Sequence, residues 1–247
     1  MSKATKDKRP KGARYGEAFF CLFYLLFMVG MIIIMKIRYD AVYTVGQVDF
    51  NDPGRMDAHR FTFGIMLAFL LVFGDCFHLI PRIVYDFKGK LKKKDFMFGI
   101  GSLVSSITMT FFYNILIGFA DSMEYRGLEY NMFIEKGILA LTVIRVVILL
   151  LPWNRWFSPE PNVKWAVIRN IPFVLIGILT VRGLINVIRH ARIYPVGFYK
   201  TMIVCVILSF LFYLPVAILG KKYPKLGMLM VPKTICYMVL IYAICFY

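Results

Sequence analysis

Long polar stretches are missing from this chain of 247 residues. Hydrophobic residues make up 60% of it and charged residues only 18%, which is far more apolar than an ordinary soluble domain. No segment between the apolar runs is long enough to form a separate soluble domain. The composition therefore predicts an integral membrane protein, in which any chemistry takes place inside a helical bundle or at its ends.

Cysteine and histidine are too few and too scattered to predict a metal centre. Of the three histidines, His59 and His190 are expected at the opposite membrane face from His78, so that three ligands cannot converge on a zinc ion. All the cysteines fall inside apolar runs at no metal-ligand spacing, where a thiol usually acts as a small apolar filler. They are Cys21, Cys76, Cys205, Cys236 and Cys245. We therefore expect no metal, no disulfide and no cofactor.

Seven apolar segments have the ~20 residues that a membrane-spanning helix needs. They cover residues 17–36, 61–83, 96–118, 132–152, 165–187, 197–219 and 227–247. Because lipid offers the backbone no hydrogen bonds, the segments are expected to be α-helices. The first is expected to stay attached, since no small-residue signal-peptide cleavage site follows it. The predicted fold is all-α, a polytopic bundle of seven transmembrane helices (17–247) after a basic cytoplasmic tail (1–16).

Acidic residues are scarce, with 14 Asp and Glu against 30 Lys and Arg. Eighteen of the basic residues lie in four stretches, at 1–14, 82–95, 153–169 and 220–225. By the positive-inside rule these stretches are cytoplasmic, so the N-terminus is inside and, after an odd number of spans, the C-terminus is outside. Basic clusters that flank spans favour contact with anionic lipids over nucleic acid. We therefore expect a multi-pass protein of the cell membrane with lipids as its neighbours.

Three ionisable residues from three spans lie at a similar depth. Asp75, Arg145 and Lys233 are about 10, 15 and 12 Å from the cytoplasmic ends of their spans, at 1.5 Å per residue. Charges inside a span are costly and usually face the bundle interior, where they pair or line a cavity. With Arg182 added, three cations face one carboxylate, which favours an anionic ligand, although Arg182 lies nearer the outside and can snorkel to the surface. The alternative is that Asp75 pairs with Arg145 or Lys233 and fixes helix packing.

Two helical faces extend this polar region. His78 and Arg82 follow Asp75 at i+3 and i+7 on one face, and the Asp75–His78 pair suits either a proton relay or an interfacial hydrogen bond. The third span carries a stripe that either lines a pathway or joins helices. Its members are Ser102, Ser106, Thr110, Tyr113 and Asn114. Pro81, Pro215 and Pro232 each free a backbone carbonyl in the cytoplasmic halves of three spans, which favours a polar cavity there.

The preferred interpretation is a non-enzymatic protein that binds or transports a small anionic or amphiphilic ligand in a cytoplasm-facing polar cavity. The candidate ligand-binding residues are Asp75, His78, Arg145, Lys233, Ser106, Thr110, Tyr113 and Asn114. One alternative is an intramembrane lipid-modifying hydrolase, with Asp75 and His78 as acid and base and Ser106 as nucleophile. Another is a structural membrane subunit. Small residues such as Gly101 and Ser105 permit helix association within one chain or in an oligomer.

Overall fold

The computed structural model describes residues 11–45, 53–89, 93–123, 129–158, 162–191, 194–220 and 223–247. Its seven α-helices are α1 (Lys11–Val45), α2 (Pro53–Lys88), α3 (Lys94–Ser122), α4 (Glu129–Leu150), α5 (Val163–His190), α6 (Val196–Leu219) and α7 (Met230–Phe246). Two short 3-10 helices, η1 (Pro152–Asn154) and η2 (Pro224–Leu229), precede α5 and α7. The described ranges contain no strand. The predicted all-α architecture is confirmed.

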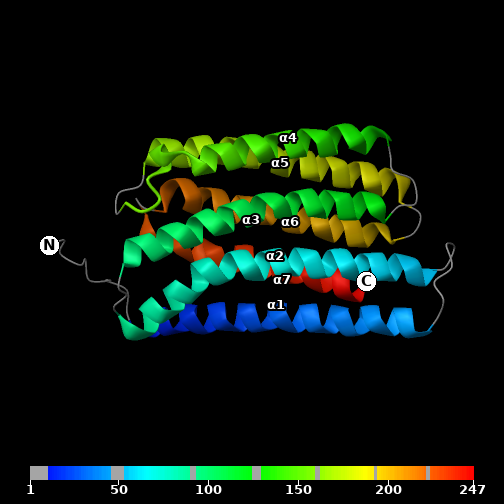
Figure 1. The fold of residues 1–247 in the computed structure, drawn as a ribbon, viewed down its shortest axis with the longest axis horizontal. Helices are drawn as coiled ribbons and strands as arrows, with labels where there is room; N and C mark the ends of the chain where they lie inside the picture. Colours follow the sequence, from blue (N-terminus) through cyan, green and yellow to red (C-terminus); the bar gives the residue numbers. More distant parts are fainter. Residues whose placement is uncertain are drawn as a thin grey trace.

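The helices are long and apolar enough for a multi-pass membrane protein. Six of those described, all except α4, could cross a membrane by length and composition. The apolar stretch of α4 is interrupted by Glu135, Lys136 and Arg145. It nevertheless lies alongside α5 and α3 in the same bundle (Figure 1). At 1.5 Å per residue, α1 and α2 are each more than 50 Å long, so that both extend beyond the roughly 30 Å hydrocarbon layer.

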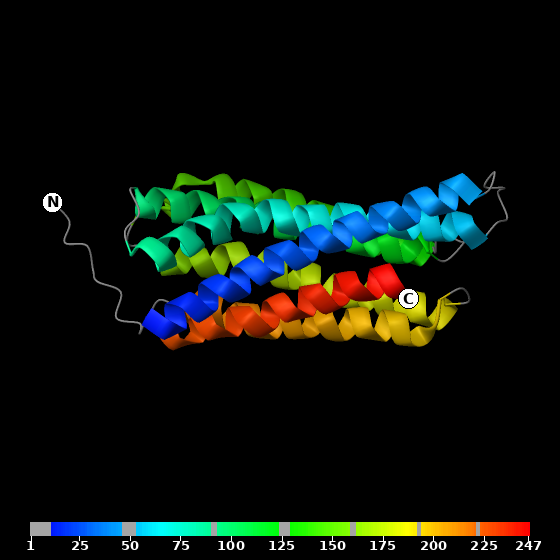
Figure 2. The same ribbon diagram turned by 90° about the horizontal axis from the view of Figure 1, so that it is seen from below.

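The helices form an elongated bundle in which α1 crosses between two groups. Seen from below, α6 and α7 lie side by side, and α1 runs obliquely from their side to the start of α2 (Figure 2). Helix α1 packs against both α2 and α7, while α3 packs against α2, α4 and α5. We call the end of the bundle where α1, α3 and α5 begin and α2, α4 and α6 end the basic end, because the predicted cytoplasmic stretches adjoin it. Helix α7 ends toward the opposite end (Figure 2).

Helix ends at the basic end are closed by local hydrogen bonds. Helix α2 stops before Gly89, whose φ of 68° is a conformation that glycine adopts without strain. After α4, the Asn154 amide donates to the carbonyls of Ile148 and Leu151, and the Trp156 indole N–H donates to the Leu149 carbonyl at 2.8 Å. These bonds satisfy carbonyls that a helix end leaves free. They also hold Trp156 beside the bundle interior.

Helices α2 and α3 approach closely at a bend. Pro81 lies inside α2, which bends toward its end (Figure 1). Because proline has no backbone N–H, the Phe77 carbonyl lacks its usual helical partner. Gly101 of α3 lies directly against that carbonyl, and a Cβ at this position would overlap it. Gly101 therefore allows α3 to pack closely against α2 within the same chain.

Lys233 lies at the start of a helix and not in the middle of one. The last predicted span begins at residue 227, but the α-helix begins at Met230, after η2. Pro232 consequently falls in the first turn of α7, directly after η2, where its missing N–H leaves the Met228 carbonyl without an α-helical partner. Pro81 and Pro215 lie inside α2 and α6, whereas Pro232 lies just after the junction of η2 and α7.

Candidate functional site

A cavity of about 700 Å³ lies toward the basic end, between α1, α2, α3, α5, α6 and α7. This volume is typical of small-molecule sites in proteins. Its charged lining residues are Glu17, Asp75, Arg82, Arg169 and Lys233. Tyrosines, serines, His78 and Thr234 complete its polar wall, and Trp156 and apolar residues of α1, α2, α6, η2 and α7 form most of the remainder.

Asp75 is held by hydroxyl groups. The Tyr24 hydroxyl donates to one carboxylate oxygen at 2.7 Å, and the Ser105 hydroxyl is 3.3 Å from the other. Within the described residues, Asp75 forms no ion pair with Lys233 or Arg145. The carboxylate therefore joins α1, α2 and α3 through hydroxyls and leaves the lysine unpaired.

Lys233 lines the cavity, and its ammonium group lies over two tyrosine rings. The Nζ atom is 4.8 Å from the centre of the Tyr213 ring and 5.4 Å from that of Tyr237. Across the described part of the chain, this ammonium has no hydrogen bond and no ion pair. Its three donors remain available to a molecule in the cavity.

Arg169 and Arg145 are also held on aromatic rings. The Arg169 guanidinium lies 4.1 Å from the centre of the Trp156 ring, with a long 3.4 Å contact to Asn154. Arg145 is only 1% exposed and stacks on Phe173 at 3.4 Å. It lies outside the cavity lining, and its Nε and Nη1 atoms have no hydrogen-bond partner in the described residues. Of these two arginines, Arg169 is the one that reaches the cavity.

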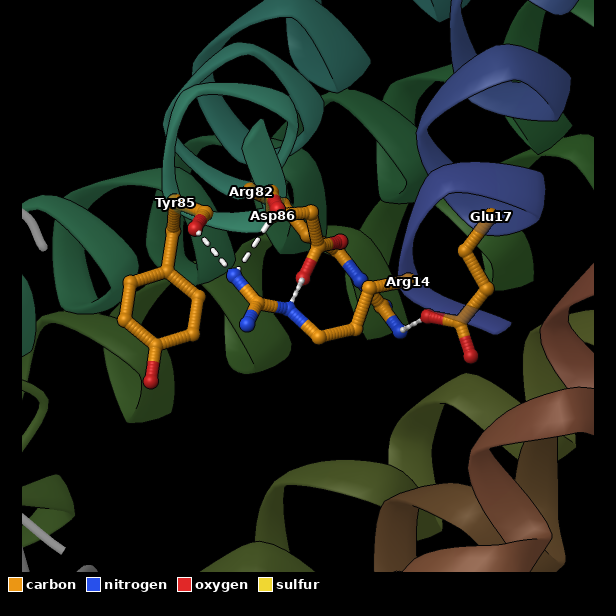
Figure 3. A network of polar contacts seen from close by, with 5 residues as sticks. All are labelled: Arg14, Glu17, Arg82, Tyr85 and Asp86. Carbon is orange, nitrogen blue, oxygen red and sulfur yellow. Dashed lines mark hydrogen bonds and ion pairs between the residues drawn. The ribbon is translucent and has the colours of Figure 1, made fainter. Parts of the chain in front are cut away.

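The rim of the cavity is a network between α1 and α2 (Figure 3). Arg14 donates to the carbonyls of Tyr85 and Asp86 at 2.9 and 2.8 Å, close to the end of α2. Arg82 donates to Glu17 at 2.7 Å. Arg14 belongs to the predicted tail, 1–16, but it lies in α1, which begins at Lys11. The helix therefore includes residues 11–16 of that tail, while residues 1–10 fall outside the described ranges. The rim thus fixes the two helices relative to each other.

His78 lines the cavity but is not joined to Asp75 or Ser106. Its Nδ1 is buried and has no partner among the residues described, and the two Asp75 oxygens accept from Tyr24 and Ser105. Ser106 donates to the Ser102 carbonyl of its own helix at 2.6 Å. Ser106 and His78 therefore do not form the hydrogen bond that a nucleophile and its general base would share.

The polar stripe of α3 divides into two parts. Ser102 and Ser106 line the cavity, whereas the residues further along α3 hydrogen-bond within the bundle. Asn114 donates to Thr142 of α4 at 2.6 Å and to the Thr110 carbonyl, and the Thr110 hydroxyl donates to the Ser106 carbonyl. The Tyr113 hydroxyl is 3.1 Å from that of Ser209 and 3.2 Å from that of Tyr237. Thr110, Tyr113 and Asn114 therefore lie outside the cavity lining.

The lining residues that the sequence prediction does not single out as ligand-binding include Tyr24, Arg169, Tyr213 and Tyr237. Tyr24 follows Glu17 at i+7, so a search for helical spacing in the first span could have found it. The tyrosines otherwise look like ordinary membrane-interface residues, and Arg169 like a residue that sets orientation. In the described ranges, no three His, Cys, Asp or Glu residues are placed to hold a metal ion.

Comparisons with known proteins leave the function to be inferred from this geometry. No protein-family model matches the chain, and neither a curated protein nor a solved structure matches it.

Proposed function

We propose that this membrane protein binds a small acidic ligand in the cavity and that the cavity opens toward the cytoplasm. The observation that carries the proposal is that two cations, Lys233 and Arg169, line a 700 Å³ space while resting on aromatic rings and not on carboxylates. The orientation rests on the basic stretches that adjoin this end of the bundle.

The charges around the cavity favour an anion. At the rim Glu17 neutralises Arg82 at 2.7 Å. Deeper in the bundle, Asp75 is the remaining carboxylate of the lining, together with the two cations Lys233 and Arg169, and Arg145 is buried outside the lining. A cation in a low-dielectric interior is costly without a counter-charge. A phosphate or carboxylate would supply that charge through hydrogen bonds that are stronger than neutral ones.

Aromatic support leaves the cations ready to bind. A cation over a ring gains about 0.5–2 kcal/mol, and this interaction uses none of its hydrogen-bond donors. Lys233 and Arg169 are thus oriented while their N–H groups remain available. An ion pair with a protein carboxylate would hold them equally well but would occupy those donors.

Packing beyond the cavity supports binding over passage through the bundle. Tyr237 lines the cavity, and its hydroxyl meets those of Tyr113 and Ser209 behind it. Phe112 and Phe173 pack edge-on against this group, and both are buried. Side chains therefore fill the interior between this layer and the opposite end.

The first experiment is native mass spectrometry of the purified full chain, with the wild type compared with a Lys233→Met, Arg169→Met double variant. We expect an acidic adduct on the wild type that the double variant loses. In parallel, butyl phosphate and butyrate are titrated while the unfolding temperature is followed, and the double variant should bind at least tenfold more weakly. Lys200→Met is the matched control, because Lys200 is exposed near the opposite end. A folded double variant that binds like the wild type would rule the proposal out.

A further inference from the structure

The cavity lining changes character along its length in the same order on four of the helices, while α3 contributes serines at both levels. On α1, Tyr24 lies deepest, and Phe20 lies one turn nearer to the basic end. On α2, Asp75 lies deepest and Leu79 follows one turn later. One turn corresponds to about 5.4 Å along the helix axis. Both helices therefore present a polar group at the closed end of the cavity and an apolar group above it, with His78 beside Leu79 on α2.

Helices α6 and α7 repeat this order. Tyr213 lies one turn deeper than Val216 on α6, and Lys233 lies almost one turn deeper than Met230 on α7. We group Arg169 with these polar residues, because the neighbouring Asn170 accepts a hydrogen bond from the Tyr213 hydroxyl at 3.1 Å, while the Arg169 guanidinium lies over Trp156. We call the deep polar level (Tyr24, Asp75, Arg169, Tyr213 and Lys233) the floor, and the apolar level (Phe20, Leu79, Val216 and Met230) the collar.

We propose that the ligand is an acidic amphiphile that binds head first, with its phosphate or carboxylate at the floor and its alkyl chain against the collar. This inference rests on the proposed function and specifies the class of ligand. It differs from binding of a free anion, which would use the floor alone and leave the collar in contact with water.

Two features of the cavity support the amphiphile. Burying an alkyl chain against the collar removes apolar surface from water on both sides, so that each methylene adds to the affinity. The charges of the rim cancel between Arg82 and Glu17. An acidic head therefore gains more at the floor, where Lys233 and Arg169 have no carboxylate partner among the described residues, than at the rim.

The first test varies the ligand. The full chain in amphipol is titrated with inorganic phosphate, dodecyl phosphate, dodecanoate and dodecanol, and the unfolding temperature is followed. We expect dodecyl phosphate or dodecanoate to bind at least tenfold more tightly than inorganic phosphate. Dodecanol, which has the chain without the acid, should give no stabilisation that depends on Lys233. Whichever of the two acids binds more tightly identifies the head group.

The second test varies the collar. Val216→Phe fills the collar, and Val204→Phe makes the same change on the lipid-facing side of α6, where Val204 is 52% exposed. We expect Val216→Phe to lower the affinity for the twelve-carbon acid at least tenfold and Val204→Phe to leave it unchanged. A cooperative unfolding transition without ligand shows that each variant folds.

The outcomes separate the two proposals. If inorganic phosphate or butyl phosphate binds as tightly as dodecyl phosphate, the cavity is an anion site and the amphiphile is wrong, while the proposed function stands. If the two Phe variants bind the twelve-carbon acid equally well, the collar plays no part and the amphiphile is again wrong. If none of the acids binds, both proposals fail.

Discussion

Asp75 shows how a carboxylate can stay inside a membrane protein without a paired cation. Its two oxygens accept from Tyr24 and Ser105, and each of these donors comes from a different neighbouring helix. Hydrogen bonds to a charged group contribute more than those between neutral groups, about 1.5–3 kcal/mol each. The side chain is thus both a joint between α1, α2 and α3 and a negative charge at the floor of the cavity.

The Asp75→Asn variant separates these two roles. Asparagine keeps an oxygen that accepts from Tyr24, and the Ser105 hydroxyl can accept from its amide, so the unfolding temperature should change little. Removal of a negative charge near Lys233 should tighten acid binding about fivefold, which corresponds to about 1 kcal/mol. Titration of butyl phosphate into wild type and variant measures this. A large loss of stability with unchanged affinity would show that Asp75 only joins helices.

Tyr24→Phe removes the shorter of the two hydrogen bonds to Asp75 without changing the shape of the side chain. We expect a loss of about 1.5–3 kcal/mol in the free energy of unfolding, because the buried carboxylate loses a donor. Tyr242→Phe is the matched control, since Tyr242 lies on α7 with half of its surface exposed. Reversible unfolding in detergent gives both values, and equal losses would contradict the role assigned to Tyr24.

The sequence predicts the charged part of the site better than its neutral part. Asp75, His78 and Lys233 stand out because ionisable residues are rare in apolar spans, and all three line the cavity. Tyr24 and Tyr213 do not stand out, because tyrosine is common in membrane helices. Arg145 is predicted from its depth along α4, yet it packs on Phe173 outside the cavity lining. The direction in which its side chain points depends on the rotation of α4 about its axis, which residue spacing alone does not specify.

At the scale of the helices, the α2–α3 pair is the closest contact at the cavity wall. Gly101→Ala places a methyl group against the Phe77 carbonyl and should cost about 1–3 kcal/mol. Gly118→Ala on the same helix meets nothing within 4 Å and should be neutral or slightly stabilising, because alanine is the better helix former. Unfolding of the two variants in one detergent compares them. Equal stability would mean that α2 and α3 can separate at Gly101 without cost.

Hydropathy predicts that the helices exist better than it predicts where they begin and end. Apolar runs predict all seven helices, but α1 and α2 continue well beyond their runs into polar sequence at both ends. There the helix continues because backbone hydrogen bonds within it do not depend on apolar side chains. Helix α7 begins later than predicted, since η2 comes first. That difference moves Lys233 from the middle of an apparent span to a first turn.

At the scale of the whole molecule, the orientation in the membrane can be tested with single cysteines. Lys88 at the end of α2 and Lys200 near the start of α6 are both exposed and lie at opposite ends of the bundle. We expect a membrane-impermeant maleimide to label Lys200→Cys on intact cells and Lys88→Cys only after permeabilisation. The wild type, with its five native cysteines, gives the background. The reverse pattern would place the cavity on the outer side.

The aromatic rings under Lys233 and Arg169 have a further consequence, which concerns the measured affinity of the empty site. In a charged pocket, a carboxylate of the protein can form an ion pair with the cation when the ligand is absent. The measured affinity is then reduced, because only the molecules without this internal ion pair can bind. Lys233 and Arg169 rest on tyrosine and tryptophan faces, which cannot take up their hydrogen-bond donors. Within the described residues no carboxylate pairs with either cation, so self-pairing should not lower the measured affinity for an acid.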